Sequence, residues 1–396
     1  MPVHSFPDLG VSPAVVEALA RRGVTTPFPI QARIMGDALA GRDILAGSAT
    51  GSGKTLAFAI PIVERIQSGD RRPAALVLVP THELASQVVR EFEDIAIAKH
   101  LRVAAAYGGI SIREQSKAVS RGDILVATPG RLEDLCIRKL VRLDGVRILI
   151  LDEADRMLDM GFEPQVASIV RRIAPDRQTM FFSATLEGAV GNVAARYTRN
   201  PIRHQIEAAR RTVEEADHRF IPVTEHSKVE ALVGLLQAEP GLSLVFVRTK
   251  RGAERLAARL KLRGISVAAM HGDLTQSARE RTLARFGSGT VSTLVATDVA
   301  ARGLDVSNIA HVINYDPPAD DDGYVHRVGR TARAGRSGLG VTLVTPDQQG
   351  DVSRMAARLS LADEFRAEGM VIAPPRMVFS SRGRRSGMRR TPRRRA

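Results

Sequence analysis

The sequence predicts an α/β protein with two parallel sheets in tandem, each covered by helices. Short apolar runs alternate with helix-length amphipathic segments, this alternation occurs twice, and polar residues follow most of the runs directly. Continuous apolar strands separated by helices are typical of a parallel sheet buried on both faces. The chain of 396 residues is long enough for about two or three domains.

The first series of elements follows a helical lead-in. Ser12-Pro13 and Gly23 bound one expected helix, and Pro29 and Gly41 bound a second. Ligands of such sheets collect at the carboxyl ends of the strands, so the polar residues after each run are site candidates. The strand-like runs are residues 43–46, 76–79, 103–106, 124–127, 148–151 and 180–182, with helical segments at 82–98 and 162–173.

A second series follows a stretch, between about residues 200 and 217, in which the apolar periodicity fails. We expect a first domain at 1–205, a linker at 206–217 and a second domain at 218–372. The second series has strand-like runs at 220–223, 244–247, 267–270, 294–296, 312–314 and 341–344, helices at 252–262 and 275–286, and one or two last helices within 347–368.

The remaining residues, 373–396, form a basic tail that we expect to be disordered. From Arg376 onwards it holds nine of the net fourteen positive charges and no acidic residue. Such a tail favours binding to a polyanion, most often nucleic acid, although a merely solvated end is the alternative.

Composition excludes several classes of protein. The single cysteine, Cys136, excludes an internal disulfide and a cysteine-based metal cluster, and it suits a reducing cytosol. The N-terminus resembles no signal peptide, and no apolar run approaches the length of a membrane span. We therefore expect a cytoplasmic protein without a membrane partner.

Residues 47–55 predict a nucleotide site. An apolar run leads into this glycine-rich stretch and a helical pattern leads out, so backbone N–H groups and the positive helix end would meet a phosphate chain. Lys54 supplies a charge for the terminal phosphates and Thr55 a hydroxyl for Mg²⁺. Ser48 stands where the pattern usually has glycine, and an ordinary turn capping a core helix is the alternative.

Asp152 and Glu153 follow the most apolar run of the first half. An acid across from a phosphate loop can hold Mg²⁺ through water while its neighbour orients the attacking water. We assign Asp152 to the metal and Glu153 to the water. The alternative is a helix N-terminus enriched in acids because they suit its dipole.

Arg330 and Arg333 lie three residues apart and would share one helix face. Two guanidinium groups reaching a γ-phosphate across a cleft would act as arginine fingers, whereas a solvated Arg-rich helix is the alternative. The second series has no phosphate loop of its own, so we expect the nucleotide between the two sheets.

In this order and spacing the motifs resemble the DEAD-box ATP-dependent RNA helicases of helicase superfamily 2, over residues 6 to about 345. The resemblance implies two tandem RecA-like domains, ATP and Mg²⁺ as cofactors, and RNA as the partner. It implies catalytic roles for Lys54, Asp152, Glu153, Arg330 and Arg333. It places ATP against Phe6, Gln31, Thr50, Gly51, Ser52, Gly53, Lys54, Thr55 and Asp305.

The resemblance also implies residues that couple ATP to RNA, and a track for the RNA backbone. The coupling residues are Asp155, Ser183, Thr185 and His326. The RNA-binding residues are Pro80, Thr81, Gly108, Gly109, Thr128, Pro129, Gly130, Arg131, Thr249, Gln276, Arg279 and Thr297. The family bends one RNA strand and opens short duplexes locally, and its bacterial members suggest ribosome assembly or RNA decay as settings.

The run 152–162 and the basic tail look most like the bacterial RhlE-type branch. Three positions depart from the family pattern. His82 stands where the family usually has arginine, Val24 replaces an aromatic residue near the adenine, and Ala332 replaces a glycine between the two arginines.

Other classes of protein fit less well. A DNA-directed superfamily 2 translocase shares the ATP site but usually differs at the glutamine motif and at residues 152–155. A non-catalytic RNA-binding scaffold would need a decayed ATP site, and the key residues are all present. A nucleotide kinase is disfavoured because the second sheet repeats the first.

Overall fold

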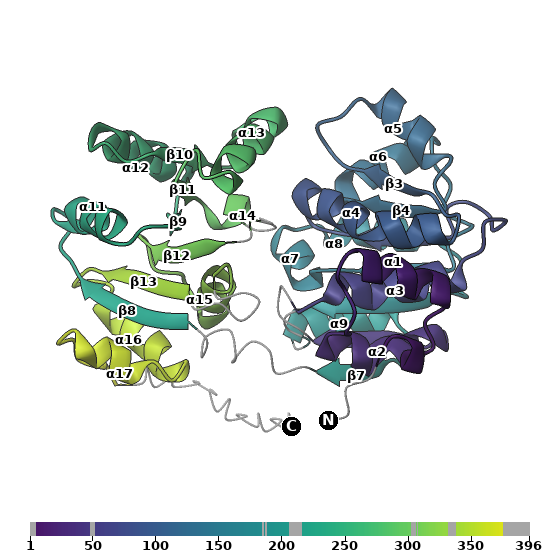
Figure 1. The fold of residues 1–396 in the computed structure, drawn as a ribbon, viewed down its shortest axis with the longest axis horizontal. Helices are drawn as coiled ribbons and strands as arrows, with labels where there is room; N and C mark the ends of the chain where they lie inside the picture. Colours follow the sequence, from purple (N-terminus) through teal and green to yellow (C-terminus); the bar gives the residue numbers. More distant parts are fainter. Residues whose placement is uncertain are drawn as a thin grey trace, which may run out of the picture.

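Two sheets flanked by helices form the two halves of the molecule, as Figure 1 shows. The computed structural model describes residues 5–47, 52–183, 186, 188–205, 216–301, 306, 308–331 and 338–374. In this part of the chain, no helix is both long enough and apolar enough to cross a membrane.

The first sheet has seven parallel strands in the order β3-β4-β2-β5-β6-β1-β7. Because the strands are parallel, all their carboxyl ends meet at one edge of the sheet. That edge is where the predicted site residues of the first half follow their strands. The strands are β1 (Ile44–Gly47), β2 (Ala75–Leu78), β3 (Val103–Ala106), β4 (Ile124–Ala127), β5 (Ile148–Leu151), β6 (Gln178–Ser183) and β7 (Ile202–Gln205).

Strand β7 corrects the sequence analysis, which found no strand in this stretch. It pairs in parallel with β1 at the edge of the sheet. Ile202 is its one apolar residue, and its side chains alternate between half-buried and exposed. An edge strand with one solvent-facing side needs no apolar run, so the pattern that marks the other strands is missing here.

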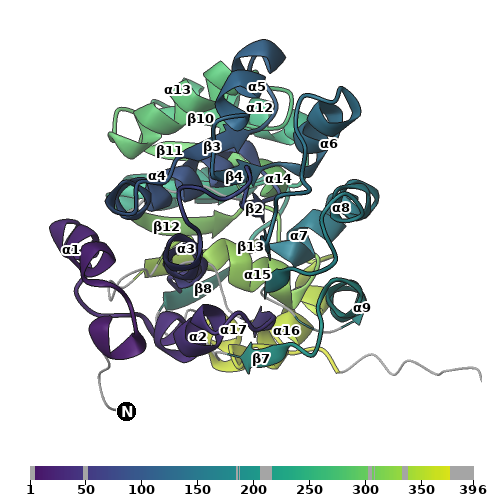
Figure 2. The ribbon, with the colours of Figure 1, turned by 90° about the vertical axis from the view of Figure 1, so that its right-hand side faces the viewer.

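Helices cover both faces of this sheet, and its strands bury alternate residues on opposite faces. Val77 and Val79 pack into one hydrophobic cluster, Leu76 and Leu78 into the other, as the two-residue period of a strand requires. Figure 2 separates the two helical layers. One contains α1 (Pro13–Arg21), α2 (Pro29–Leu39), α3 (Lys54–Arg65) and α4 (His82–Ala98), the other α5 (Ile112–Val119), α6 (Pro129–Ile137), α7 (Ala154–Asp159), α8 (Glu163–Val170) and α9 (Gly188–Tyr197).

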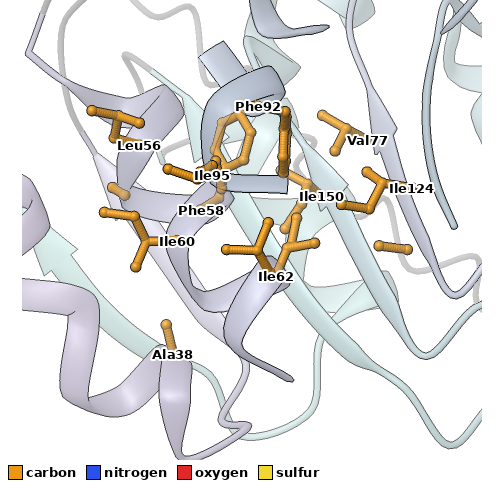
Figure 3. Packing of buried hydrophobic residues seen from close by; sticks show 14 of the residues in the cluster. Ala38, Leu56, Phe58, Ile60, Ile62, Val77, Phe92, Ile95, Ile124 and Ile150 are labelled. Carbon is orange, nitrogen blue, oxygen red and sulfur yellow. The ribbon is translucent and has the colours of Figure 1, made fainter. Parts of the chain in front are cut away.

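Helix α3, which follows the phosphate loop, is anchored by aromatic packing (Figure 3). The ring of Phe58 lies 6.2 Å from that of Phe92 on α4 and 5.3 Å from that of Phe182 on β6, measured between centroids. Burying one such side chain contributes roughly 1.5–3 kcal/mol. The start of α3 is therefore held rigidly against the sheet.

The second sheet has six parallel strands in the order β10-β11-β9-β12-β13-β8 and begins at Ala216, inside the predicted linker. The two sheets confirm the predicted fold class. The strands are β8 (Ala216–Pro222), β9 (Leu242–Phe246), β10 (Val267–Met270), β11 (Thr293–Ala296), β12 (Ile309–Asn314) and β13 (Gly338–Val344). The helices are α11 (Lys228–Ala238), α12 (Lys250–Leu262), α13 (Gln276–Gly287), α14 (Asp298–Ala301), α15 (Asp321–Val328), α16 (Gln349–Arg358) and α17 (Ala362–Ala367).

The two halves touch where α4 meets α13. Glu83, in the first turn of α4, pairs with Arg279 of α13 at 2.9 Å between Oε1 and Nη2, and both side chains are nearly buried. Beside this pair, His82 Nε2 lies 3.9 Å from Glu280 Oε1. The contact brings the first turn of one helix from each half together.

Candidate active site

The phosphate loop ends at Gly53, which caps α3 with a φ of +87°. A Cβ on Gly53 would lie 2.7 Å from Gln31 Nε2, so the position accepts only glycine. Lys54 and Thr55 then open the helix, with Lys54 buried. Thr50 and Gly51 lie outside the described residues.

The structure places Gln31 directly against the phosphate loop. Its Oε1 accepts the Phe28 N–H at 2.9 Å and its Nε2 donates to the Gly53 carbonyl at 2.9 Å. Gln31 is fully buried and Phe6 is only 1% exposed within the core. Gln31 therefore supports the start of α2 and the end of the loop from inside, whereas Phe6 is part of the hydrophobic core. The contacts of both residues with ATP stay predictions.

Asp152, directly after β5, is a buried carboxyl near Lys54. Burial raises the pKa of Asp152 to about 6, although the charge of Lys54 opposes this. Ionised Asp152 is thus only partly compensated by the protein. A bound cation would supply the rest of the compensation.

These donors fit a magnesium ion held jointly with phosphate. Mg²⁺ is usually bound through one or two carboxylates, several waters and substrate phosphates, and Asp152 and the Thr55 hydroxyl are oxygen donors of this kind. No cluster of three or more His, Cys, Asp or Glu side chains suited to a metal occurs within the described ranges.

Glu153 is buried beside Asp152 but has the opposite electrostatic setting. Burial, the largest influence, raises its pKa, yet Arg156, Lys54 and Arg330 together hold the pKa of Glu153 below its ordinary value. Arg156 Nη1 donates to Glu153 Oε2 at 2.6 Å. Glu153 also adopts a left-handed conformation, with a φ of +50°, which is uncommon for a non-glycine residue. An ionised carboxylate at this place can accept a proton or orient a water.

The predicted coupling residues of the first half lie together. The Asp155 N–H donates to Ser183 Oγ at 3.3 Å. Ser183 is the in-register neighbour of Gly47, the residue that leads into the phosphate loop. Thus the ends of β1, β5 and β6 are connected, while Thr185 lies outside the described residues.

The structure corrects the prediction that Arg330 lies on one helix face with Arg333, because helix α15 ends before Arg330. The helix stops at Val328, next to Gly329, a poor helix former. The Arg330 N–H then bonds to the Arg327 carbonyl at 3.0 Å, a tighter turn with three-residue spacing. Arg330 is buried and its charge lowers the pKa of Glu153 in the other half. Arg333 and Asp305 lie outside the described residues.

Arg327, which sequence reasoning did not single out, lies at the centre of the second sheet's carboxyl edge. It forms a bidentate pair with Asp298, at 2.6 and 2.7 Å, and donates to Asn314 Oδ1 at 2.9 Å and to the Asp316 carbonyl at 2.6 Å. Its guanidinium carbon also lies 4.8 Å from the centroid of the Phe246 ring. The network fixes the backbone of Arg327 and of the preceding His326. The His326 carbonyl in turn accepts a hydrogen bond from Arg330 Nε at 3.3 Å.

Asp316 extends this network to the turn after β9. Its carboxylate accepts the buried Lys228 ammonium at 3.0 Å and the Arg248 N–H at 2.8 Å. The adjacent Thr249 is a predicted RNA contact, so Asp316 connects that turn to Arg327. Lys228 and Asp316 are 88 positions apart, and no local pattern could have paired them.

Three of the predicted RNA-binding threonines stand at helix N-termini on the carboxyl edges. Thr81, Thr128 and Thr249 are the N-cap residues of α4, α6 and α12. Helix N-termini present free N–H groups and partial positive charge, which suit phosphates. Thr297 is buried immediately before α14.

The other predicted RNA-binding residues differ in what they contact. Arg131 Nη1 donates to the Ile110 carbonyl at 2.9 Å and to Gln115 Oε1 at 2.7 Å, which ties α6 to the loop of Gly108 and Gly109. Gln276 begins α13, and Arg279 pairs with Glu83 instead of facing solvent. Pro80, Pro129 and Gly130 flank Thr81 and Thr128 at the strand ends.

The site combines a buried phosphate-loop lysine after β1, two carboxyls after β5, which is separated from β1 by β6, and an arginine from a second parallel sheet. This combination defines a two-domain nucleoside triphosphatase. Family models agree with this class. Residues 28–193 match the DEAD/DEAH box helicase model and residues 227–335 match the helicase conserved C-terminal domain.

The chain belongs to the family of DEAD-box ATP-dependent RNA helicases. It is 41% identical, over 350 residues, to the DEAD-box ATP-dependent RNA helicase CshA of Geobacillus kaustophilus, covering 88% of this chain and 75% of that protein. Similar relatives from Bacillus are also named CshA. The predicted RhlE-type branch is therefore not supported.

Two solved structures are similar to most of this chain, across both domains. A variant of Saccharomyces cerevisiae Dbp5 bound to RNA and ADP BeF3 has a TM-score of 0.80 at 29% identity, covering 93% of this chain and 95% of that one. The same variant bound to nup159, gle1, ip6 and ADP has a TM-score of 0.63 at 28% identity, with 92% and 95% covered.

Proposed function

We propose that this protein is an RNA clamp that ATP closes and hydrolysis opens. One observation carries the proposal above the others: Arg330, from the second domain, lowers the pKa of Glu153 in the first. A charge from one sheet thus acts on the candidate water-orienting residue of the other. A nucleotide between them would be contacted by both domains.

On the first domain, we infer that Lys54 and the N–H groups at the start of α3 bind the terminal phosphates. Thr55 and Asp152 would hold Mg²⁺, in part through water, and its positive charge would offset the negative charge that develops on the phosphates. Glu153, kept ionised by its basic neighbours, orients the attacking water. Arg330 and Arg333 contact the γ-phosphate from the second domain.

The contact between the domains supports closure as the active step. The likeness to one and the same Dbp5 variant is greater with RNA and ADP BeF3 bound than with ADP and protein partners. Because the Dbp5 chain is the same in both comparisons, the difference favours a domain arrangement close to the RNA-bound one. The pair Glu83–Arg279 would form only in that arrangement.

RNA would bind along the helix N-termini at Thr81, Thr128 and Thr249, with Thr297 beside them. Contacts of this kind fix the position of the phosphate backbone without reading bases. Preference for RNA over DNA would come from 2′-hydroxyl contacts. The basic tail from Arg376 would add sequence-independent affinity.

RNA-stimulated ATPase activity of Lys54→Ala, Glu153→Gln and Arg330→Ala tests the site directly. Each is expected to lose most of the turnover, whereas Arg121→Ala, on the exposed turn before β4 at the opposite edge of the sheet, serves as the control. Wild-type turnover in all three variants would show that the site is assigned wrongly. Stimulation by DNA and not by RNA would favour a DNA translocase instead.

A further inference from the structure

His82 lies at the contact between the two domains, where its side chain is only 12% exposed. Its Nε2 atom lies 3.9 Å from Glu280 Oε1 of α13. The centroid of its ring also lies 3.8 Å from that of Tyr107, which follows β3 in the first domain. Packing against Tyr107 therefore holds the imidazole with Nε2 turned towards the second domain.

A neutral imidazole makes little use of this position. Its Nδ1 atom is buried and has no hydrogen-bond partner among the described residues, so Nε2 is the atom through which the ring can act. The separation of 3.9 Å between Nε2 and the Glu280 carboxylate exceeds the length of a hydrogen bond, which is about 2.7–3.2 Å. A protonated ring would instead attract the carboxylate by its charge, and this attraction persists at that distance.

The residue type at position 82 matters because the family usually has arginine there. An arginine side chain is charged at every physiological pH. A histidine ordinarily gains its charge between about pH 5 and 8. The charge at this domain contact can therefore be switched by pH in this chain, whereas an arginine would make it permanent.

The charged groups around His82 come from both domains. On its own helix, the N-terminal end of α4 disfavours a positive charge and the acidic Glu83 favours one. From α13, Arg279 disfavours the charge and Glu280 favours it, but Arg279 is paired with Glu83 at 2.9 Å. Tyr107 contacts the imidazole through its ring. Glu280 is therefore the acidic group whose approach to His82 depends on the arrangement of the domains.

We propose that His82 is a positioning residue for domain closure, and that its imidazolium form pairs with Glu280 across the contact. The inference rests on the proposed function, because it assumes that ATP and RNA bring the domains together. Protonated His82 has the Glu280 carboxylate beside it when the domains are closed and loses it when they are open. Closure thus gains this pairing at low pH, where the ring is charged in both arrangements, and the gain is lost as rising pH removes the proton.

RNA affinity at about pH 6 and about pH 8, the range in which histidine ordinarily titrates, tests the proposal with a saturating non-hydrolysable ATP mimic. The pKa of Asp152 is about 6, so the ratio of the affinity at low pH to that at high pH is compared between variants. This ratio is expected to be about threefold larger for wild type than for His82→Gln or Glu280→Gln, on the scale of a partly exposed ion pair. His226→Gln, which removes an exposed histidine on the turn before α11, should keep the wild-type ratio.

A purely structural role for the ring would give a different pattern. Loss of packing against Tyr107 would weaken RNA binding by the same factor at both pH values, and Glu280→Gln would have no effect. His82→Arg supplies a charge that does not titrate. This variant should have the small ratio of His82→Gln but bind RNA more tightly than His82→Gln at about pH 8, by about threefold. If it binds no more tightly, charge is not what this position supplies, and the proposal fails.

Three further results would overturn the proposal. In the first, His82→Gln keeps the wild-type ratio. In the second, Glu280→Gln keeps that ratio while His82→Gln loses it, which would assign the proton to a contact with RNA. In the third, the ATP mimic raises the affinity, but wild type and His82→Gln differ in their ratios just as much without it. Failure of the proposed function would look different, because the ATP mimic would then leave the RNA affinity of wild type unchanged at every pH.

Discussion

The carboxyl edges of the two sheets differ in how far the protein compensates the buried charges that lie there. In the first domain, Asp152 is buried with incomplete compensation, so its pKa rises to about 6. In the second, Arg327 is equally buried but is paired with Asp298 and bonded to Asn314 and Asp316. The first edge leaves a charge that a ligand would compensate, whereas in the second the charge of Arg327 is compensated within the protein.

This difference separates residues that act on the nucleotide from residues that position them. A charge that the protein does not compensate opposes folding and is retained for binding. A fully bonded charge fixes geometry, and its loss is felt as instability. The contrast therefore predicts which substitutions should cost activity, which should cost stability, and in which order.

The largest effect is expected for Asp152→Asn. RNA-stimulated turnover should fall by about a hundredfold or more, because the Mg²⁺ position loses its charge. A carboxyl whose pKa is raised on folding is ionised in both states at pH 7.5, and there its burial opposes folding. The variant should thus unfold at the same urea concentration as wild type or at a higher one. Its free energy of unfolding should exceed that of wild type by up to about 3 kcal/mol. A variant that is both inactive and less stable than wild type would contradict the view that the charge of Asp152 is retained for binding and opposes folding.

Arg327→Met should show the reverse balance, with stability lost first. Removing one partner of a buried pair typically costs 3–5 kcal/mol, and we expect about 2–3 kcal/mol because Asp298 is 37% exposed. Urea unfolding of Arg327→Met, Asp298→Asn and the double variant measures the coupling. If the single changes simply add, the two side chains do not act as a pair.

The pair that joins the domains sharpens the comparison further. Glu83→Gln or Arg279→Gln should weaken RNA binding in the presence of an ATP mimic by about tenfold, as expected for a coupling of about 1–1.5 kcal/mol between contacting side chains. Unfolding of the separate domains should not change, since the pair lies between them. The double variant should bind no worse than either single one. Equal loss without nucleotide would show that the pair is unrelated to closure.

The smallest effect is expected for deletion of residues 376–396. Single-strand binding changes its salt slope by about 0.7 for each phosphate contact removed. The deletion should flatten the slope of RNA affinity against salt and leave basal ATPase activity in place. An unchanged slope would show that the tail contributes solubility alone.

The fold could be predicted because buried parallel strands require apolar runs, such as residues 124–127 and 148–151, where β4 and β5 lie. Helix α4, which follows Thr81, begins and ends as the sequence predicts. Strand β7 was not predicted because an edge strand needs few apolar residues, and this one has only Ile202. The end of α15 was missed because the three-residue spacing of Arg330 and Arg333 suggests a helix there, whereas α15 ends at Val328.

The candidate site was predictable only where a local motif carries the chemistry. Asp152 and Glu153 directly follow β5, Lys54 ends the glycine-rich stretch after β1, and the structure places the three together. The Lys228–Asp316 and Glu83–Arg279 pairs join distant segments, so the sequence gives no sign of them.

The distance between the two domains tests the central claim most directly. The single native thiol, Cys136, is buried and its pKa is raised to about 11 by that burial, so it should resist labelling. Dyes on Glu93→Cys of α4 and Arg259→Cys of α12, both exposed, would report the separation by energy transfer. The account predicts a higher transfer efficiency with a non-hydrolysable ATP mimic and oligoribonucleotide than with neither. An efficiency that both ligands together leave unchanged would contradict it.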